Sequence, residues 1–194
     1  MTAQPDGDLV VRIQDGDLDA LGELYERHKT SVYRTALAIT RDEKAAEDIL
    51  QETFLRVYTY AYSIDCAVPL GPWLYRVTVN LAYTWARQAK RWLHSLQDIL
   101  DRWVSPPQWH PETATEEEEW RLILQQAIDA LPPRHRVVVI LHYLEGLGLK
   151  DISCVIGVPE GTVKSRLYYA RESLRKTILE RERRLVPEVA YDFT

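Results

Sequence analysis

The sequence predicts an all-α protein of two small helical domains joined by a flexible linker, with a helix-turn-helix in the C-terminal domain. Apolar residues recur every three or four positions along most of the chain, which is the period of an amphipathic helix. This pattern fades over residues 94–118, where prolines and an acidic run interrupt it. A glycine-started turn between two helical stretches near residue 157 gives the third observation.

The first domain is expected to span residues 1–93 and to contain four helices. Leu9, Val10 and Ile13 mark a short helix that Asp15-Gly16-Asp17 closes. Asp17 is expected to cap a long second helix. The apolar stripe of that second helix consists of Leu21, Leu24, Tyr25, His28, Val32 and Ala36.

The third and fourth helices of this domain also have start signals. Thr40-Arg41-Asp42-Glu43 has the form of a capping box with Thr40 as the N-cap. Pro72 suits the first turn of the fourth helix, after a loop at residues 63–71. The expected buried positions are Ala46, Ile49, Leu50, Thr53, Phe54, Val57 and Tyr58 on the third helix, and Leu74, Val77, Leu81, Ala82 and Trp85 on the fourth.

The remaining chain divides into a linker, a second domain and a tail. The linker is placed at residues 94–118, with one short helix allowed at 96–103, and the second domain at 119–185. A helix beginning near Trp120 ends at Pro132-Pro133, and Arg134–Leu144 forms the next. Residues 137–141 would also fit a strand, but their flanking residues favour a helix. The tail, residues 186–194, carries no recognisable motif.

The helix-turn-helix is the most informative motif. Residues 149–156 form its first helix, Gly157 starts the turn, and Thr162 is expected to be the N-cap of the second helix. Val163, Leu167, Ala170, Leu174 and Ile178 form the buried stripe of the second helix. Helices of this kind present base contacts near their N-termini in the major groove. The candidate DNA-binding residues are Thr162, Lys164, Ser165, Arg166, Tyr168, Tyr169 and Arg171.

Two further surfaces are predicted in the first domain. Aromatic, amide and guanidinium groups on one helix face suit single-stranded DNA, although Trp73 and Tyr83 fit the core equally well. That face carries Trp73, Arg76, Asn80, Tyr83 and Arg87. On the preceding helix, Asp48, Glu52 and Arg56 lie one turn apart beside Gln51. They form either a solvated face with i,i+4 pairing or a polar docking strip for a protein partner.

Composition narrows the class of protein. The net charge is −5, but basic residues concentrate at 87–91 and 164–184, so local faces can still attract DNA. The two cysteines are far apart and have no ligand spacing, so no metal or other cofactor is expected. No secretory signal or membrane-spanning run is present, which makes a cytoplasmic location without membrane insertion the default.

Together these elements resemble the extracytoplasmic-function (ECF) group of bacterial RNA polymerase sigma factors, over about residues 8–185. Leu131-Pro132 with Arg136-Val137 adds to the resemblance. The most specific strings are AEDILQETFLR at 46–56, WLYRVTVNLA at 73–82 and PEGTVKSRL at 159–167.

The resemblance implies a role in promoter-specific transcription initiation, with no covalent catalysis and no small-molecule substrate. The strip of Asp48, Gln51, Glu52 and Leu55 would bind core RNA polymerase. The loop at 65–71 and the helix bearing Trp73 would capture and open the minus-ten promoter element, and the helix-turn-helix would read the minus-thirty-five element. An anti-sigma factor is an expected partner. Tyr169 stands where the family commonly has Arg, and the capture loop lacks the usual Phe-Arg before the Trp.

Three other classes compete with this interpretation. An enzyme is disfavoured because no Glu-x-x-His pair, phosphate-binding loop or nucleophile elbow occurs. A sigma-like mimic that sequesters an anti-sigma factor would need no basic recognition helix. A stand-alone helix-turn-helix regulator would need an N-terminal domain that dimerises or binds a ligand. The promoter sequence, the inducing signal and the identity of any anti-sigma factor lie beyond the sequence.

Overall fold

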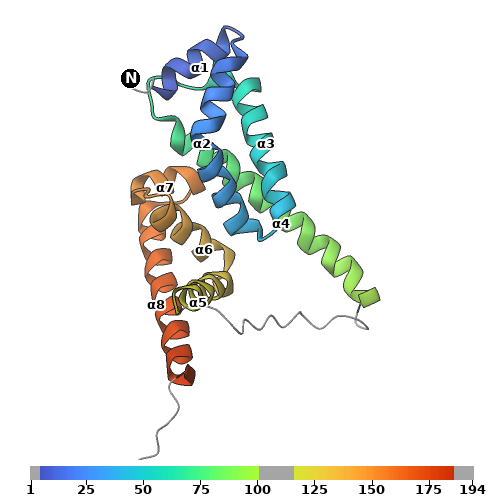
Figure 1. The fold of residues 1–194 in the computed structure, drawn as a ribbon, viewed down its shortest axis with the longest axis vertical. Helices are drawn as coiled ribbons and strands as arrows, with labels where there is room; N and C mark the ends of the chain where they lie inside the picture. Colours follow the sequence, from blue (N-terminus) through green and yellow to red (C-terminus); the bar gives the residue numbers. More distant parts are fainter. Residues whose placement is uncertain (1–4, 101–115, 186–194) are drawn as a thin grey trace, which may run out of the picture.

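The computed structural model describes residues 5–100 and 116–185, and every regular element within these ranges is a helix (Figure 1). The all-α class is therefore confirmed. The N-terminal domain consists of α1 (Asp6–Gln14), α2 (Leu18–Thr40), α3 (Glu43–Thr59), the short 3-10 helix η1 (Ala61–Ser63) and α4 (Leu70–Leu100). The C-terminal domain consists of α5 (Glu116–Ala130), α6 (Pro133–Val139), the π-helical turn η2 (Ile140–Leu144), α7 (Leu149–Ile156) and α8 (Glu160–Leu185).

The outer end of the N-terminal domain has its own hydrophobic cluster. Leu9, Val10 and Ile13 of α1 are buried, as predicted, against Leu24 and Val32 of α2. Asp17 caps α2 by accepting hydrogen bonds from the backbone N–H groups of residues 19 and 20. The predicted first helix and its stop before α2 are confirmed.

The junction between α2 and α3 differs from the predicted capping box. Thr40 is still part of α2, and its hydroxyl donates to the Ala36 carbonyl at 2.9 Å. Arg41 then takes a left-handed conformation with φ of 60°, and the Asp42 carboxylate caps α3 by accepting from the Ala45 N–H. The Thr40 hydroxyl is already engaged within α2, so the cap moves two residues along the chain.

The buried faces of α3 and α4 differ from the prediction at several positions. Tyr58 is 47% exposed, so the buried stripe of α3 ends at Val57. On α4, Leu74 and Ala82 are buried as expected, but Val77, Leu81 and Trp85 are only partly buried. Thr78 and Val79 are buried instead. Val79 shares a hydrophobic cluster with residues of the C-terminal domain, a contact that no periodicity within α4 reveals.

In the C-terminal domain, a buried arginine closes the first helix. The Arg136 side chain, on α6, donates to the carbonyls of Ile128, Asp129 and Leu131 at 2.8–3.2 Å. Ile128 and Asp129 lie in the last turn of α5 and Leu131 directly follows it, where a helix leaves carbonyl acceptors without an intrahelical partner. Burial is the main cause that lowers the pKa of this guanidinium. The hydrophobic residues that follow, Val137 to Leu141, are all buried.

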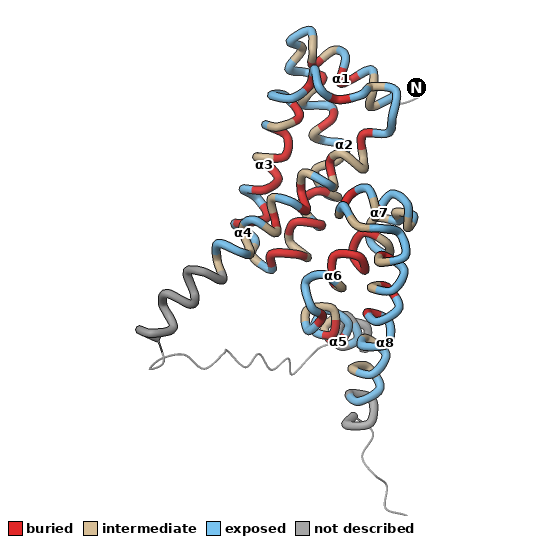
Figure 2. The backbone as a smooth tube through the Cα atoms, turned by 180° about the vertical axis from the view of Figure 1, so that it is seen from behind, coloured by how far each residue is buried: buried red, intermediate tan, exposed pale blue. Residues whose placement is uncertain are grey.

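The two domains pack directly against each other. One hydrophobic cluster contains Ile39 of α2 and Val79 of α4 together with Leu141 of η2 and Val155 of α7. Figure 2 shows buried segments of α2 and α4 facing those of α6 and α7. The sequence predicted two domains with separate helices but gave no indication of this shared core.

Helices take up both ends of the predicted linker. The α4 helix continues to Leu100, past the expected domain end at residue 93, and α5 begins at Glu116. Residues 101–115, which include the end of the short helix allowed at 96–103, lie outside the described residues, as does the tail at 186–194. Among the described helices, none is both long and apolar enough to span a bilayer.

Candidate nucleic-acid and partner interfaces

The helix-turn-helix is formed by α7 and α8. Gly157 ends α7 in a left-handed conformation, φ 66°, which glycine adopts without strain. Its N–H donates to the Ser153 carbonyl, and the Ser153 hydroxyl reaches across the turn to the Val158 carbonyl at 2.6 Å. Both contacts fix the angle at which the chain enters α8.

The second helix of this motif starts earlier than predicted. It begins at Glu160, and the Pro159 carbonyl accepts from the N–H groups of Thr162 and Val163 at 2.8 and 3.2 Å. Thr162 therefore lies within the first turn and is not the N-cap. Proline has a fixed φ near the helical value, which allows the helix to start directly after it.

The predicted stripe anchors α8 and leaves its opposite face open. Val163, Leu167 and Ala170 are buried, and Leu174 and Ile178 are partly buried. Tyr168 and Tyr169 are each 61% exposed. Of the other candidate DNA-binding residues, Lys164, Ser165 and Arg171 are exposed, and Thr162 and Arg166 are partly buried.

Two residues outside the predicted set flank this face. The His135 ring stacks on the Tyr169 ring, with the ring centroids 6.5 Å apart and the ring planes 17° apart. Burial is the main cause that lowers the pKa of His135. Arg171 donates to the Tyr143 hydroxyl and lies 5.6 Å from the centre of its ring. Both partners come from other helices, so the spacing along α8 contains no signal for them.

The candidate single-strand surface on α4 is only partly open. Arg76, Asn80 and Arg87 are exposed, whereas Trp73 packs against the cluster around α1. Tyr83 packs against the shared core, and its hydroxyl lies 3.4 Å from the Pro133 carbonyl oxygen. Burial raises the pKa of Tyr83 to about 12. The structure thus places both aromatic residues partly in cores, while the three polar residues share the open face.

The candidate docking strip runs along the outer face of α3. Asp48 and Gln51 are exposed, and Leu55 is 58% exposed. Glu52 is partly buried and pairs with Arg56 at 2.8 Å. The i,i+4 pairing expected of a plain solvated face is present, and an exposed leucine accompanies it. Tyr58, which the sequence placed in the core, extends this exposed strip by one turn.

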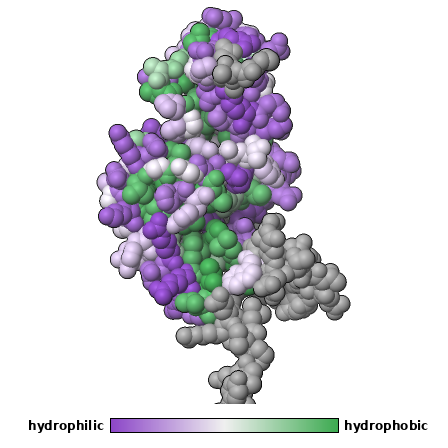
Figure 3. Space-filling view, turned by 60° about the vertical axis from the view of Figure 1, so that its left-hand side comes forward, coloured by the Kyte–Doolittle hydropathy of each residue, from purple (hydrophilic) through white to green (hydrophobic). Residues whose placement is uncertain are grey.

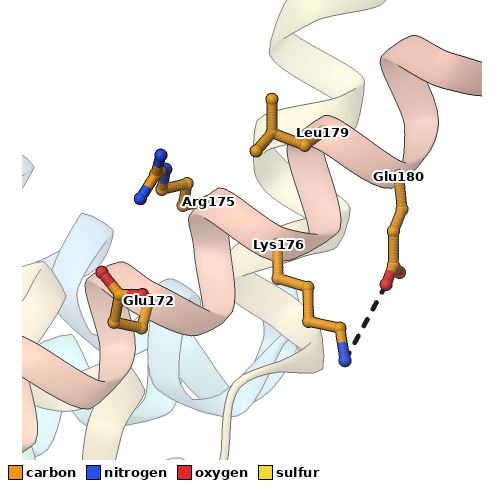
Figure 4. A pocket seen from close by; sticks show the side chains of 5 residues that line it. All are labelled: Glu172, Arg175, Lys176, Leu179 and Glu180. Atoms are coloured by element: carbon orange, nitrogen blue, oxygen red, sulfur yellow. Dashed lines mark ion pairs between the residues drawn. The ribbon is translucent and has the colours of Figure 1, made fainter.

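The described residues contain no group of three or more metal-ligating side chains. A shallow pocket on the outer side of α8 is lined by that helix alone (Figure 4), with Lys176 and Glu180 3.9 Å apart. Figure 3 shows apolar side chains gathering at the height of α5, α6 and α8, beside strongly hydrophilic ones.

Comparison with known proteins identifies both domains. The family model for Sigma-70 region 2 matches residues 24–92, and that for Sigma-70, region 4 matches residues 121–174. The chain is 30% identical to the ECF RNA polymerase sigma factor SigW of Bacillus subtilis, over 87% of this chain and 94% of the relative. It is 35% identical to SigL of Mycobacterium tuberculosis, another ECF RNA polymerase sigma factor, over 81% of this chain and 88% of the relative.

Solved structures support the same fold. CnrH, in complex with the cytosolic domain of CnrY, matches with a TM-score of 0.64 and 20% identity over 89% of this chain and 96% of that one. The sigma factor RpoE of Bartonella quintana, in complex with the anti-sigma factor NepR, matches with a TM-score of 0.61 and 20% identity, over 80% of this chain and 96% of that one. With relatives at 30% and 35% identity matched over 94% and 88% of their own lengths, the chain belongs to the ECF RNA polymerase sigma factors.

Proposed function

We propose that this chain binds core RNA polymerase through α3 and directs it to promoters through α4 and α8. The α3 strip of Asp48, Gln51, Glu52 and Leu55, extended by Tyr58, is the polymerase-binding surface. The open face of α4, with Arg76, Asn80 and Arg87 beside Trp73 and Tyr83, binds the opened minus-ten element. The α8 face from Thr162 to Arg171 reads the minus-thirty-five element.

The observation that carries this proposal is the division of α8 into two faces. Its apolar stripe is buried, and the opposite face presents two exposed tyrosines among Lys164, Ser165 and Arg171. A lysine or serine can donate to base edges, and an aromatic ring can contact the methyl group of thymine. Arginines beside them suit phosphates, which provide affinity without sequence information.

The polymerase-binding role of α3 rests on its combination of charge and exposed apolar surface. A partner that covers Leu55 and Tyr58 removes apolar area from water, while Asp48 and Gln51 provide directional contacts. Interfaces of this kind derive most of their affinity from a few central side chains. We therefore expect Leu55 to contribute more than the ion-paired Glu52.

Transcription from a promoter selected for this protein, with purified core polymerase, tests the three surfaces separately. Asp48→Arg should weaken binding to core polymerase. The matched control is Asp15→Arg, because Asp15 is an exposed carboxylate of the same domain in the turn between α1 and α2, outside the strip. Lys164→Ala and Tyr168→Ala should leave core binding intact and lower promoter use by about tenfold each, as loss of a base contact does.

The outcomes separate this function from its competitors. A sigma-like mimic would bind an anti-sigma factor and leave promoter use unchanged by any α8 substitution. A stand-alone regulator would bind its DNA site without polymerase, and Asp48→Arg would have no effect. Equal loss of core polymerase binding in Asp48→Arg and Asp15→Arg would contradict a specific α3 strip.

The proposal includes an anti-sigma partner, a cytoplasmic location and the absence of covalent catalysis. CnrH and RpoE of Bartonella quintana were both solved in complexes, the latter with an anti-sigma factor. A partner that covers α3 or the α8 face of this chain would block polymerase or promoter binding directly. Purification of the wild-type chain from its source cells should bring the anti-sigma partner with it, and substitution of Leu55 should abolish that co-purification.

A further inference from the structure

We propose that the free chain is held in a closed, inactive arrangement by a latch around Glu145, and that promoter recognition requires this latch to open. The inference rests on the proposed function, because it concerns the access of promoter DNA to the α4 and α8 surfaces. It starts from the close contact between the two domains.

The latch is a buried carboxylate of the C-terminal domain that is held by two groups of the N-terminal domain. The Glu145 side chain is only 2% exposed, although it lies directly after η2. Arg34 of α2 donates to it at 3.0–3.1 Å and also to the Leu144 carbonyl at 3.0 Å. The Tyr75 hydroxyl of α4 donates to its other oxygen at 2.8 Å.

The hydrogen bonds from Arg34 and Tyr75 to Glu145 select one relative orientation of the two domains. A buried carboxylate is costly unless donors satisfy it, and here both donors come from the other domain. The neighbouring apolar contacts, such as Val79 against the α7 helix, supply a broader and less directional attraction. A second ion pair, Arg41 to Asp129 at 2.9 Å, lies at another point of the same domain boundary. Together these contacts set both the strength and the register of closure.

Closure brings the two DNA-binding surfaces together. Tyr83 of α4 and Arg166 of α8 line the same pocket, with Pro133 and Val158 between the two helices. The promoter elements that these surfaces would read are about 25 base pairs apart, or roughly 85 Å at about 3.4 Å per base pair. Two residues that line one pocket cannot reach both elements, so the closed chain cannot engage a promoter at both sites.

The consequence is a lower apparent affinity of the free chain for its working partners. When only a fraction of molecules is competent to bind, the apparent dissociation constant rises by the inverse of that fraction. Core polymerase, which must hold the two domains apart on the promoter, would select the open fraction. Weakening the latch should therefore tighten binding without adding any contact to polymerase.

A charge swap across the latch provides the test. Glu145→Arg places a cation against Arg34 and should open the chain, while Arg34→Glu combined with Glu145→Arg should close it again. Glu180→Arg is the matched control, since Glu180 pairs with Lys176 within one helix. Small-angle X-ray scattering reports the radius of gyration, circular dichroism the helix content, and titration with core polymerase the dissociation constant.

Glu145→Arg is expected to increase the radius of gyration at unchanged helix content and to tighten core polymerase binding by roughly tenfold. The double variant should return both values to those of the wild type, and Glu180→Arg should change neither. Tyr75→Phe, which removes one donor without adding charge, should give a smaller shift in the same direction.

Two results would overturn the latch. A Glu145→Arg chain as compact as the wild type would show that the pairing does not control closure. An opened chain with wild-type or weaker polymerase binding would show that closure does not inhibit. If the wild type and all variants fail to bind core polymerase, the proposed function itself fails and the regulatory role falls with it. The scattering data distinguish this case, because they report closure without polymerase.

Discussion

Replacing Arg136 by Met should destabilise the chain more than any other single loss of charge in the C-terminal domain. Arg136 is 8% exposed, and its guanidinium donates to the carbonyls of Ile128, Asp129 and Leu131 at and just after the end of α5. Methionine keeps a similar length and volume but donates no hydrogen bond. The Asp129 and Leu131 carbonyls would then lose their side-chain donor beside a helix C-terminus, where the backbone carries partial negative charge.

The magnitude follows from the number of orphaned acceptors. The Ile128 carbonyl keeps the backbone N–H of Leu131 at 3.1 Å, so two carbonyls, those of Asp129 and Leu131, are counted. Each buried, unsatisfied carbonyl costs about 1 kcal/mol at the low end of its range, which gives about 2 kcal/mol for the two. Burial of the charged guanidinium, which lowers the pKa of Arg136, opposes this loss and argues for the low end. With a urea slope of about 2 kcal/mol per molar, the midpoint should fall by about 1 M.

Urea unfolding followed by circular dichroism measures this change. The matched control is Arg134→Met, because Arg134 lies two residues away on the same helix, is exposed, and makes no hydrogen bond or ion pair within the described part of the chain. Its effect should stay within about 0.5 kcal/mol, as for most surface substitutions. A loss below about 1 kcal/mol for Arg136→Met would refute the idea that this side chain satisfies the end of α5.

Three further predictions concern the rest of the fold. Burial, and then the hydrogen bond to Glu145, raise the pKa of Tyr75 from 10.0 to about 12. The contribution of the neutral Tyr75 side chain to the free energy of unfolding is therefore complete below pH 10.0 and is lost as the pH rises to about 12. Tyr75→Phe should flatten this part of the curve of stability against pH. Asp42→Ala should cost about 1 kcal/mol in urea unfolding and Asp42→Asn much less, whereas equal losses would contradict the cap. Ile152→Ala, at a fully buried site, should lower the free energy of unfolding by about 3 kcal/mol and abolish minus-thirty-five recognition. A loss of stability below about 1 kcal/mol would contradict tight packing of α7.

Local patterns in the sequence determined most of the individual helices. The spacing of Val163, Leu167 and Ala170 identified the buried side of α8 and, with it, the opposite exposed face, which we propose reads DNA. Gly157 indicated the turn because a left-handed residue is needed there. Such features depend on neighbours within a few residues, which is why they can be read from one sequence.

Helix boundaries were less well determined because several local signals compete. Thr40 and Asp42 both have side chains that can cap a helix, and the longer α2 decided for Asp42. Thr162 had the same appearance of a cap, but Pro159 allowed α8 to start earlier. Each miss shifted an end by a few residues and left the helix itself in place.

The sequence by itself determined the helical class, the helix-turn-helix and the surfaces that carry charged and aromatic residues. Only the tertiary structure decided that the two domains share one core, that Val79 is buried, and that Glu145 lies between Arg34 and Tyr75. Periodicity reports which side of a helix avoids water. It does not report which distant segment covers that side, because this depends on contacts between residues as far apart as positions 34 and 145.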